Sequence, residues 1–332
     1  TNSAASESVR RNTKLIVSQY GHANDNSTPT FGPEMFSFYK LDVSGKPYDI
    51  DYFDRYLKGD PNGYDDAAKV QLAVMVPPDS GNDGYAFRLS TADYPLPETM
   101  YKEMYFSSDG GANTRRGDGR LDVALPKQHS GATEDSFSYD PRDPVPSIGG
   151  SFRLGGTDAG SVYKDGAADQ TDVEVRQDVL VYTSEPLSTD LALIGPVEVT
   201  LFAKSSAPDT DFTAKLVSVR PDGASHNIVD GIVRARFRNG SKKPSSLIEP
   251  MQTYEYRIEL GHTATVIPAG HQIRVQISSS NFPKYARNLN TGKSNEASSN
   301  IAVAQQIVLH GPEHPSRIRL PVVTESILPE DP

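Results

Sequence analysis

The sequence predicts a mainly β protein with more than one hydrophobic core. Its 332 residues exceed the length at which a single core usually stops growing, about 250–300 residues. Glycine (26 residues) and proline (25 residues) are frequent, which indicates many turns between short elements. From residue 197 onward, apolar and polar residues alternate in successive short runs, the pattern of half-buried strands. These observations favour a β-rich architecture over a helical bundle.

Charge and composition exclude several partners and chemistries. The formal net charge is -10 and no basic cluster exceeds two residues, so we expect neither nucleic acid nor an anionic membrane as a partner. The absence of cysteine excludes disulfides, cysteine–zinc sites and cysteine nucleophiles. No apolar run approaches the roughly 20 residues of a spanning helix. The sequence starts at Thr1 without a signal-like apolar core, which leaves the localisation open.

The first expected element is a short buried strand that ends in a histidine loop. The apolar run from Leu15 to Val17 leads into Tyr20-Gly21-His22 and then into polar residues. In open α/β sheets, functional sites are built at this end of the strands. His22 is therefore the candidate catalytic residue, and the alternative is a surface loop histidine without a role.

Residues 49–58 predict the clearest helix of the chain. Gly59 and Pro61 end it. Strand patterns follow at residues 70–76 and 104–107. Four apolar residues fall on one face of this helix at three- and four-residue spacing: Ile50, Phe53, Tyr56 and Leu57.

A proline-rich arm spans residues 139–150. Pro141, Pro144 and Pro146 fix φ and remove backbone donors, so this stretch is neither a helix nor a central strand. Gly149 and Gly150 then permit a left-handed bend. We interpret the stretch as a rigid arm that crosses between two packed bodies.

After the arm, the alternating pattern predicts a two-sheet antiparallel sandwich or jelly roll. Its arginines Arg234, Arg236 and Arg238 share one face of a predicted strand, which indicates either an anionic ligand or, as we favour, a solvated strand face. At least seven strands are expected, at residues 197–203, 212–216, 229–237, 254–260, 273–277, 303–309 and 318–320.

Several motifs of known chemistry are missing from the sequence. It contains no Gly-x-Ser-x-Gly nucleophile elbow, no phosphate-binding loop and no dinucleotide fingerprint. His310 and His314 are four residues apart, but Pro312 and Pro315 exclude the helix that would bring them together. We therefore expect no zinc site there.

Segments along most of the chain from Lys14 onward resemble the cocaine esterase / glutaryl acylase / α-amino-acid ester hydrolase family. The arm residues Asp-Pro-Arg-Asp-Pro-Val-Pro-Ser-Ile-Gly-Gly are similar to the family's signature. That family shares its C-terminal sandwich with X-Pro dipeptidyl peptidases. The resemblance implies a C-terminal remnant of an α/β-hydrolase domain followed by a galactose-binding-like jelly-roll β-sandwich. The other matching segments, in family order, are residues 52–59, 209–212 with 221–223, 278–283, 287–292 and 313–316.

The resemblance also implies a Ser-Asp-His triad, with the histidine in a Gly-His turn after an apolar strand. His22 matches that turn, and would take the proton from the serine hydroxyl and return it to the leaving group. The family's nucleophile elbow and triad acid lie upstream of the histidine, whereas only 21 residues precede His22. The resemblance therefore implies a truncated hydrolase half, either as a fragment or as one chain of a two-chain enzyme.

The organisation implied for the chain has three parts. Residues 1–65 are the end of the hydrolase domain, 66–150 are connecting strands and the arm, and 151–332 are the sandwich, together with strands from 66–125. We expect the C-terminal part of a serine hydrolase of ester, amide or X-Pro peptide bonds, inactive alone. Its partners are a small ester or amide substrate and the missing hydrolase portion, and homo-oligomerisation is left open.

A second class of function is compatible with the same sandwich. A non-catalytic jelly-roll module would bind carbohydrate or a partner protein, because fold alone does not fix function. Neither function requires a cofactor, and the many Asp and Asn turns leave a stabilising calcium ion open.

Overall fold

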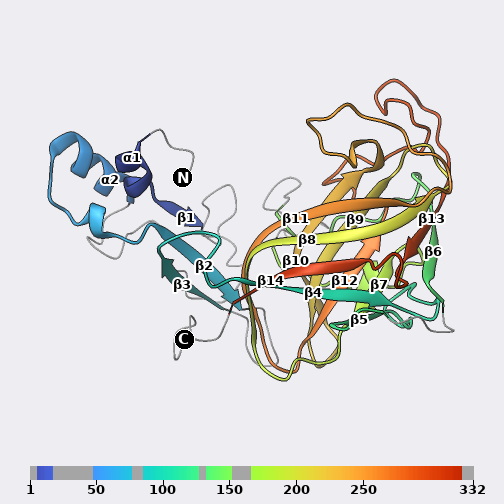
Figure 1. Cartoon of the computed structure of the whole chain (residues 1–332), viewed down its shortest axis with the longest axis horizontal. Helices are drawn as coiled ribbons and strands as arrows, with labels where there is room; N and C mark the ends of the chain where they lie inside the picture. Colours follow the sequence, from blue (N-terminus) through green and yellow to red (C-terminus); the bar gives the residue numbers. More distant parts are fainter. Residues whose placement is uncertain (1–5, 18–47, 77–84, 127–131, 152–165, 324–332) are drawn as a thin grey trace, which may run out of the picture.

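The computed structural model describes residues 6–17, 48–76, 85–126, 132–151 and 166–323. The described residues are mainly β, with 43% in strands and 9% in helices, which confirms the predicted fold class. A small lobe, on the left in Figure 1, joins a large β-sandwich on the right. The lobe contains the N-terminal elements, and the sandwich contains most strands of the described chain.

The sandwich strands form one hydrogen-bonded network in the order β11-β8-β14-β4-β5-β7-β12-β9-β10, and β13 joins β6 to β8. Every strand predicted after the arm is present, and β5, β6 and β7 were not predicted. The strands are β4 (Met100–Ser107), β5 (Arg120–Asp122), β6 (Glu134–Tyr139), β7 (Leu180–Thr183), β8 (Leu191–Ser205), β9 (Asp211–Val219), β10 (Ser225–Arg234), β11 (Tyr254–Ile267), β12 (Gln272–Ser278), β13 (Ala304–Leu309) and β14 (Arg317–Val323).

The main core lies between the two layers of the sandwich. Phe106 stacks on Tyr182 with 4.5 Å between ring centroids, and Phe212 packs against Tyr256 at 4.8 Å. All four rings are fully buried, as large aromatic side chains in a close-packed interior are. A second, smaller core forms where β2 (Val70–Val76) meets the sandwich, around side chains such as Val74. The expectation of more than one core is thus confirmed.

The lobe is a short parallel strand pair with helices beside it. Residue Leu15 of β1 (Leu15–Val17) pairs with Val70 of β2 in parallel register, and β3 (Tyr85–Thr91) pairs with the other edge of β2. No helix in the described part of the chain is long and apolar enough to cross a membrane. The helical elements of the lobe are α1 (Glu7–Asn12), α2 (Tyr48–Phe53), the π-helical turn η1 (Asp54–Lys58) and the 3-10 turn η2 (Tyr64–Asp66).

The helix predicted over residues 49–58 forms, and its apolar side chains are largely exposed. It begins as α2 and continues as the π-helical turn η1, which ends at Gly59 with φ 79°. Its buried residues are Asp51 and Asp54, whereas Leu57 is 77% exposed. Of the four apolar residues, Leu57 points away from the described chain, whereas Tyr56 lies beside Tyr64, with 5.8 Å between ring centroids. Periodicity identifies a face and not its partner.

The predicted strand over residues 229–237 is shorter than expected. Strand β10 ends at Arg234, and Ala235–Phe237 form the 3-10 turn η3. Ala235 N donates to Thr210 O at 2.9 Å, which turns the chain out of the sheet. The three arginines therefore do not share one strand face, and the expected solvated face was wrong.

The proline-rich arm does not separate two bodies. Strand β6 precedes the arm and already pairs with β13 inside the sandwich. The arm runs beside residues 280–284: Phe282 N donates to Val145 O at 2.9 Å, and Ser147 N donates to Phe282 O at 2.7 Å. Together with α3 (Thr171–Glu174), it covers the outer face of β9 and β12. The division of the chain at residue 65 stays a prediction.

Candidate functional site

The predicted catalytic residue, His22, lies outside the described residues. The structure describes the elements on either side of it: β1 ends at Val17, and α2 begins at Tyr48. The described residues therefore include the framework around residue 22, and the sandwich contains several polar clusters of its own.

Lys14, at the start of β1, attaches that strand to the lobe. Its ammonium group donates to the backbone oxygens of Ala67 and, at 3.4 Å, of Asp65. It also lies over the ring of Tyr64, 5.5 Å from the ring centroid. Burial lowers the pKa of Lys14, and the nearby aspartates oppose this shift. These contacts fix the strand that leads toward residue 22.

The helical turn is held by polar contacts with the segment that follows it. Arg55 Nε donates to Asp65 Oδ2 at 2.6 Å, and the Tyr56 hydroxyl donates to Asp65 Oδ1 at 3.0 Å. The hydrogen bond from Arg55 lowers the pKa of the Asp65 carboxyl. Asn62 Nδ2 donates to the backbone oxygen of Asp51 at 2.8 Å and closes the loop after the turn.

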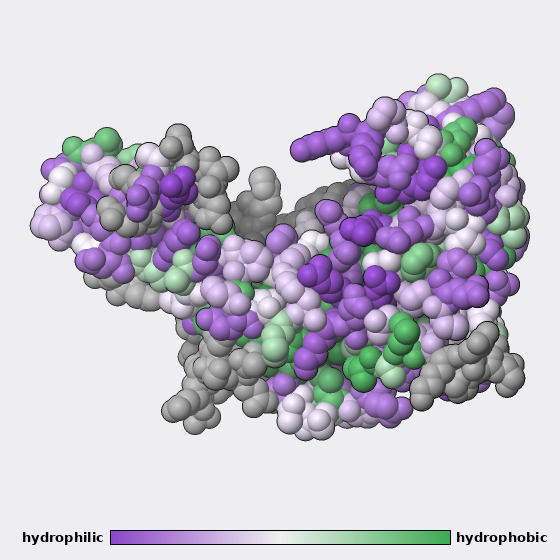
Figure 2. All heavy atoms as spheres, viewed as in Figure 1, coloured by the Kyte–Doolittle hydropathy of each residue, from purple (hydrophilic) through white to green (hydrophobic). Residues whose placement is uncertain are grey.

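The outer side of the lobe carries an exposed apolar surface. Figure 2 shows hydrophobic atoms at the outer tip of the lobe. A monomeric protein rarely exposes a contiguous apolar set of this kind on one helical turn. We call this set the lobe surface, and its residues are Ile50, Tyr52, Phe53, Tyr56 and Leu57, each 41% to 77% exposed.

A serine, a histidine and an aspartate meet inside the sandwich. Ser108 Oγ lies 3.0 Å from His310 Nε2, and the same nitrogen lies 3.1 Å from Asp135 Oδ2. All three side chains are buried. Burial raises the pKa of Asp135, but hydrogen bonds from His310, Ser108 and Tyr182 outweigh it and leave that pKa lowered.

The geometry of this cluster is not that of a catalytic triad. In a triad, one ring nitrogen of the histidine faces the serine and the other faces the aspartate. Here Nε2 faces both, and the Ser108 hydroxyl donates directly to Asp135 at 2.8 Å. The serine proton is therefore committed to the carboxylate, and the buried cluster stabilises the fold.

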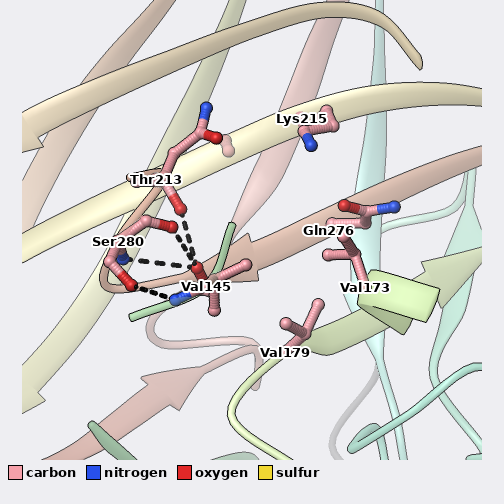
Figure 3. A pocket seen from close by; sticks show the side chains of 10 residues that line it. Val145, Val173, Val179, Thr213, Lys215, Gln276 and Ser280 are labelled. Carbon is pink, nitrogen blue, oxygen red and sulfur yellow. Dashed lines mark hydrogen bonds between the residues drawn. The ribbon is translucent and has the colours of Figure 1, made fainter. Parts of the chain in front are cut away.

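A cavity of about 10 Å³ lies between the outer face of β9 and β12 and their cover (Figure 3), with room for about one water molecule. Lys215 and Gln276 line its sheet side, and Val145, Val173 and Val179 close it. The cavity is too small to hold an organic substrate.

The ammonium group of Lys215 is buried in this cavity. It donates to Gln170 Oε1 at 2.7 Å and forms no ion pair with the residues that the structure describes. Burial lowers the pKa of Lys215 to about 8, although the charges of Asp230 and Glu174 oppose this shift. A buried cation beside a neutral amide is destabilising at neutral pH.

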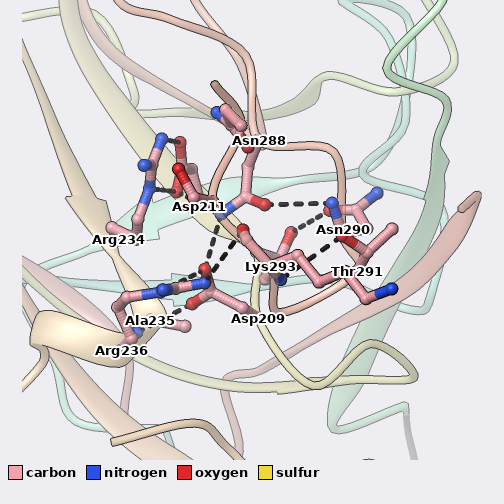
Figure 4. A network of polar contacts seen from close by, with 12 residues as sticks. Asp209, Asp211, Arg234, Ala235, Arg236, Asn288, Asn290, Thr291 and Lys293 are labelled. Atoms are coloured by element: carbon pink, nitrogen blue, oxygen red, sulfur yellow. Dashed lines mark hydrogen bonds and ion pairs between the residues drawn. The ribbon is translucent and has the colours of Figure 1, made fainter. Parts of the chain in front are cut away.

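A second buried network, shown in Figure 4, accounts for two of the arginines. Arg234 binds Asp211 through two hydrogen bonds of 2.8 and 3.0 Å, and Arg236 Nε donates to Asp209 at 2.8 Å. Asn288 Nδ2 donates to both aspartates. These arginines are therefore used within the fold and are not arranged for an external anion.

The family of the chain follows from its sequence. Residues 62–319 match the model of the X-Pro dipeptidyl-peptidase C-terminal non-catalytic domain. The chain belongs to this family. Residues 209–212 and 287–292 are two of the segments that resemble the esterase and acylase family. They contribute Asp209, Asp211 and Asn288 to the network of Figure 4, which gives the resemblance a structural basis.

Relatives of the chain include hydrolases, which confirms the resemblance stated from the sequence. Cocaine esterase of Rhodococcus sp. (strain MB1 Bresler) is 39% identical over 315 residues, which cover 93% of this chain and 51% of the esterase. A putative serine esterase of Mycobacterium bovis is 30% identical over 124 residues, 32% of this chain and 20% of that protein. The chain spans about half the length of cocaine esterase.

Solved structures share the fold over nearly the whole chain. An aminopeptidase from the marine sediment archaeon Thaumarchaeota archaeon superimposes with a TM-score of 0.74 at 25% identity, over 94% of this chain and 49% of that one. An α-amino acid ester hydrolase superimposes with a TM-score of 0.73 at 24% identity, over 95% and 51%. The second similarity shows the fold alone.

Sequence reasoning missed the buried polar groups of this non-catalytic domain. One cluster joins Ser108, Asp135 and His310, which lie far apart in the sequence, so no local motif could indicate it. Lys215 carried a weak signal, because it interrupts an otherwise mostly apolar or small-residue strand, Asp211–Val219, whose two faces are both buried.

Proposed function

We propose that this chain is the C-terminal part of a serine hydrolase that cleaves ester or amide bonds. In this proposal His22 is the triad histidine, and the serine and aspartate lie outside the chain. One observation carries the proposal. The 39% identity to cocaine esterase covers 93% of the chain, so it includes most of residues 1–61, which precede the match to the non-catalytic domain.

The lobe surface supports a hydrolase portion as partner. The helical turn after residue 47 buries Asp51 and Asp54 and exposes its aromatic and aliphatic side chains. Such an orientation is unfavourable in water unless another body covers the apolar side. The N-terminal hydrolase portion, in the same or a separate chain, is the proposed cover.

The edge of β1 supports the same partner. In the described part of the chain, β1 pairs only with β2, and the pairing is parallel. An open strand edge presents unpaired backbone groups that favour a further strand. A strand of the hydrolase portion would pair with β1 and continue this sheet. The side chains of that strand would then lie near the end of β1, after which the chain continues to His22.

The proposed role of His22 is that of general base and then general acid. It takes the proton of the serine hydroxyl as the serine attacks the carbonyl carbon, and returns that proton to the leaving alkoxide or amine. An aspartate would hold the imidazole in the required tautomer. Because no nucleophile elbow occurs in the sequence and the Ser108 cluster lacks triad geometry, this chain alone is expected to be inactive.

The intact mass of the native protein tests this proposal when it is measured beside hydrolysis of p-nitrophenyl acetate. A native polypeptide or complex well above 36.1 kDa that hydrolyses the ester supports the proposal. A native protein of the mass of this chain, without turnover even when neighbouring gene products are added, contradicts it.

The family description, a non-catalytic domain, is also compatible with the alternative of a module that binds carbohydrate or a partner protein. In that case the native protein would lack turnover and retain binding. The cavity beside Lys215 holds only about one water molecule, so such binding would use the surface of the sandwich.

A further inference from the structure

The face of the molecule shown in Figure 2 is hollowed by a notch between the lobe and the sandwich. A loop at the top of the sandwich, gold in Figure 1, juts out toward the lobe above this notch. We call residues 238–246 of the segment between η3 and β11 the basic loop. Its hydrophilic tip is visible in Figure 2 as a projection that faces the lobe.

The stem of the basic loop is held firmly. Arg238 Nη1 donates to Ser246 O at 2.7 Å and to Ala235 O at 3.0 Å, so one side chain joins both ends of the loop. Its guanidinium group lies 4.5 Å from the ring centroid of Tyr254 on β11. Because its ends are braced, the loop presents its tip in a defined position.

The tip carries two cations. Lys242 and Lys243 are exposed, and neither forms an ion pair with the residues that the structure describes. Leu247, beside the tip, is 49% exposed. A braced projection of two lysines and an apolar side chain, on a chain with a net charge of -10, is complementary to an acidic protein surface.

We propose that the basic loop is a second docking point for the hydrolase portion, which occupies the notch and meets Lys242 and Lys243 with acidic side chains. This inference rests on the proposed function, because it names the same partner. The partner then contacts the chain at two separated places, the lobe and the basic loop. Two contacts of this kind fix the orientation of one body on another.

Carbodiimide coupling in the complete polypeptide, produced with its upstream coding sequence, tests the proposal. The reagent joins a lysine amine to a carboxylate only where the two groups touch. We expect cross-links from Lys242 or Lys243 to acidic residues upstream of Thr1. The variant Lys242→Glu/Lys243→Glu loses them and shows a lower thermal unfolding midpoint, and high salt weakens the cross-links in the unmodified protein.

The matched control is Lys102→Glu/Arg116→Glu, which reverses two exposed cations on β4 and the β4–β5 loop, at the lower side of the sandwich in Figure 1. It should leave both readouts unchanged. An unmodified protein that hydrolyses p-nitrophenyl acetate but yields no such cross-link overturns this inference and leaves the proposed function intact. Cross-links to a second copy of this chain also overturn it. A failure of the proposed function would be distinguished from these outcomes, because the complete polypeptide would then not hydrolyse p-nitrophenyl acetate.

Discussion

Arg274 on β12 and Glu174 on α3 form a buried ion pair, with 2.6 Å between Nη1 and Oε2. Gln276 Nε2 and Ser225 Oγ also donate to Glu174, at 2.9 and 3.0 Å, so the carboxylate is fully hydrogen-bonded. These bonds join the cover of the sandwich to the outer face of its sheet. The ion pair therefore fixes the position of α3 relative to β12, beside the cavity that contains Lys215.

Glu174→Ala should destabilise the protein strongly. The change leaves Arg274 buried without its counter-charge, a defect that typically costs about 3–5 kcal/mol of the free energy of unfolding. Urea denaturation followed by circular dichroism measures this loss. Arg142→Ala is the control, because its pair with Asp140 is exposed and its loss should leave the unfolding midpoint unchanged. Equal effects of both variants would contradict this assignment.

Lys215→Met should stabilise the protein at neutral pH. The pKa of Lys215 is about 8 in the folded state and near its ordinary 10.5 in the unfolded state. Below pH 8 both states bind the proton and the full cost of burial is present, on the order of 3 kcal/mol. The variant removes that cost, offset by the lost hydrogen bond to Gln170.

The pH dependence distinguishes this effect from a packing change. Between pH 8 and 10.5 the unfolded state binds more protons, so the stability of the unmodified protein rises with pH relative to the variant. The free energy of unfolding of both proteins, measured from pH 6.5 to 10.5, should show this convergence. A constant difference across that range would contradict the account.

Gly149→Ala should disrupt the proline-rich arm. Gly149 has φ 74°, and an added Cβ would lie 2.4 Å from Asn227 Oδ1 and 2.6 Å from Gly166 O. We expect a loss of more than about 2 kcal/mol in the free energy of unfolding, from strain and collision together. Gly59→Ala is the matched control, since its φ is 79° but nothing lies within 4 Å of an added Cβ. The account fails if both variants lose the same stability.

Ser108→Ala should lower stability without affecting hydrolysis. The variant removes the hydroxyl that donates to Asp135 inside the core and should cost about 1–3 kcal/mol. Turnover of p-nitrophenyl acetate by the complete enzyme at 20 °C should remain at the level of the unmodified protein. Loss of turnover in a folded Ser108→Ala protein would show that this cluster is catalytic after all.

The sequence predicted the sandwich well because apolar residues recur at every second position along most of its strands, a pattern that can be recognised within a few residues. Alternation at residues 197–203 and 273–277 located β8 and β12, and the run Val70–Val76 matched β2 residue for residue. Strands such as Arg120–Asp122 are too short to carry a period, and Glu134–Tyr139 is mostly polar, so both were missed.

Tertiary contacts explain the remaining differences. The helix over 49–58 was correctly located, but the spacing of its apolar residues could not show what covers them, and Leu57 is 77% exposed among the described residues. Strand β10 stops at Arg234 because Asp209 and Asp211, about 25 residues earlier, bind the arginines. The role of His22 stays a prediction, since it lies outside the described residues.

The most direct measurement is the rate of p-nitrophenyl acetate hydrolysis by the complete polypeptide carrying His22→Ala. His314→Ala is the control, since that ring packs beside Phe202 in the sandwich, with 5.5 Å between centroids. The account predicts that turnover falls by at least about 10³-fold in His22→Ala and is unchanged in His314→Ala. Full turnover in a folded His22→Ala protein would contradict the assignment of this chain to a hydrolase that uses His22.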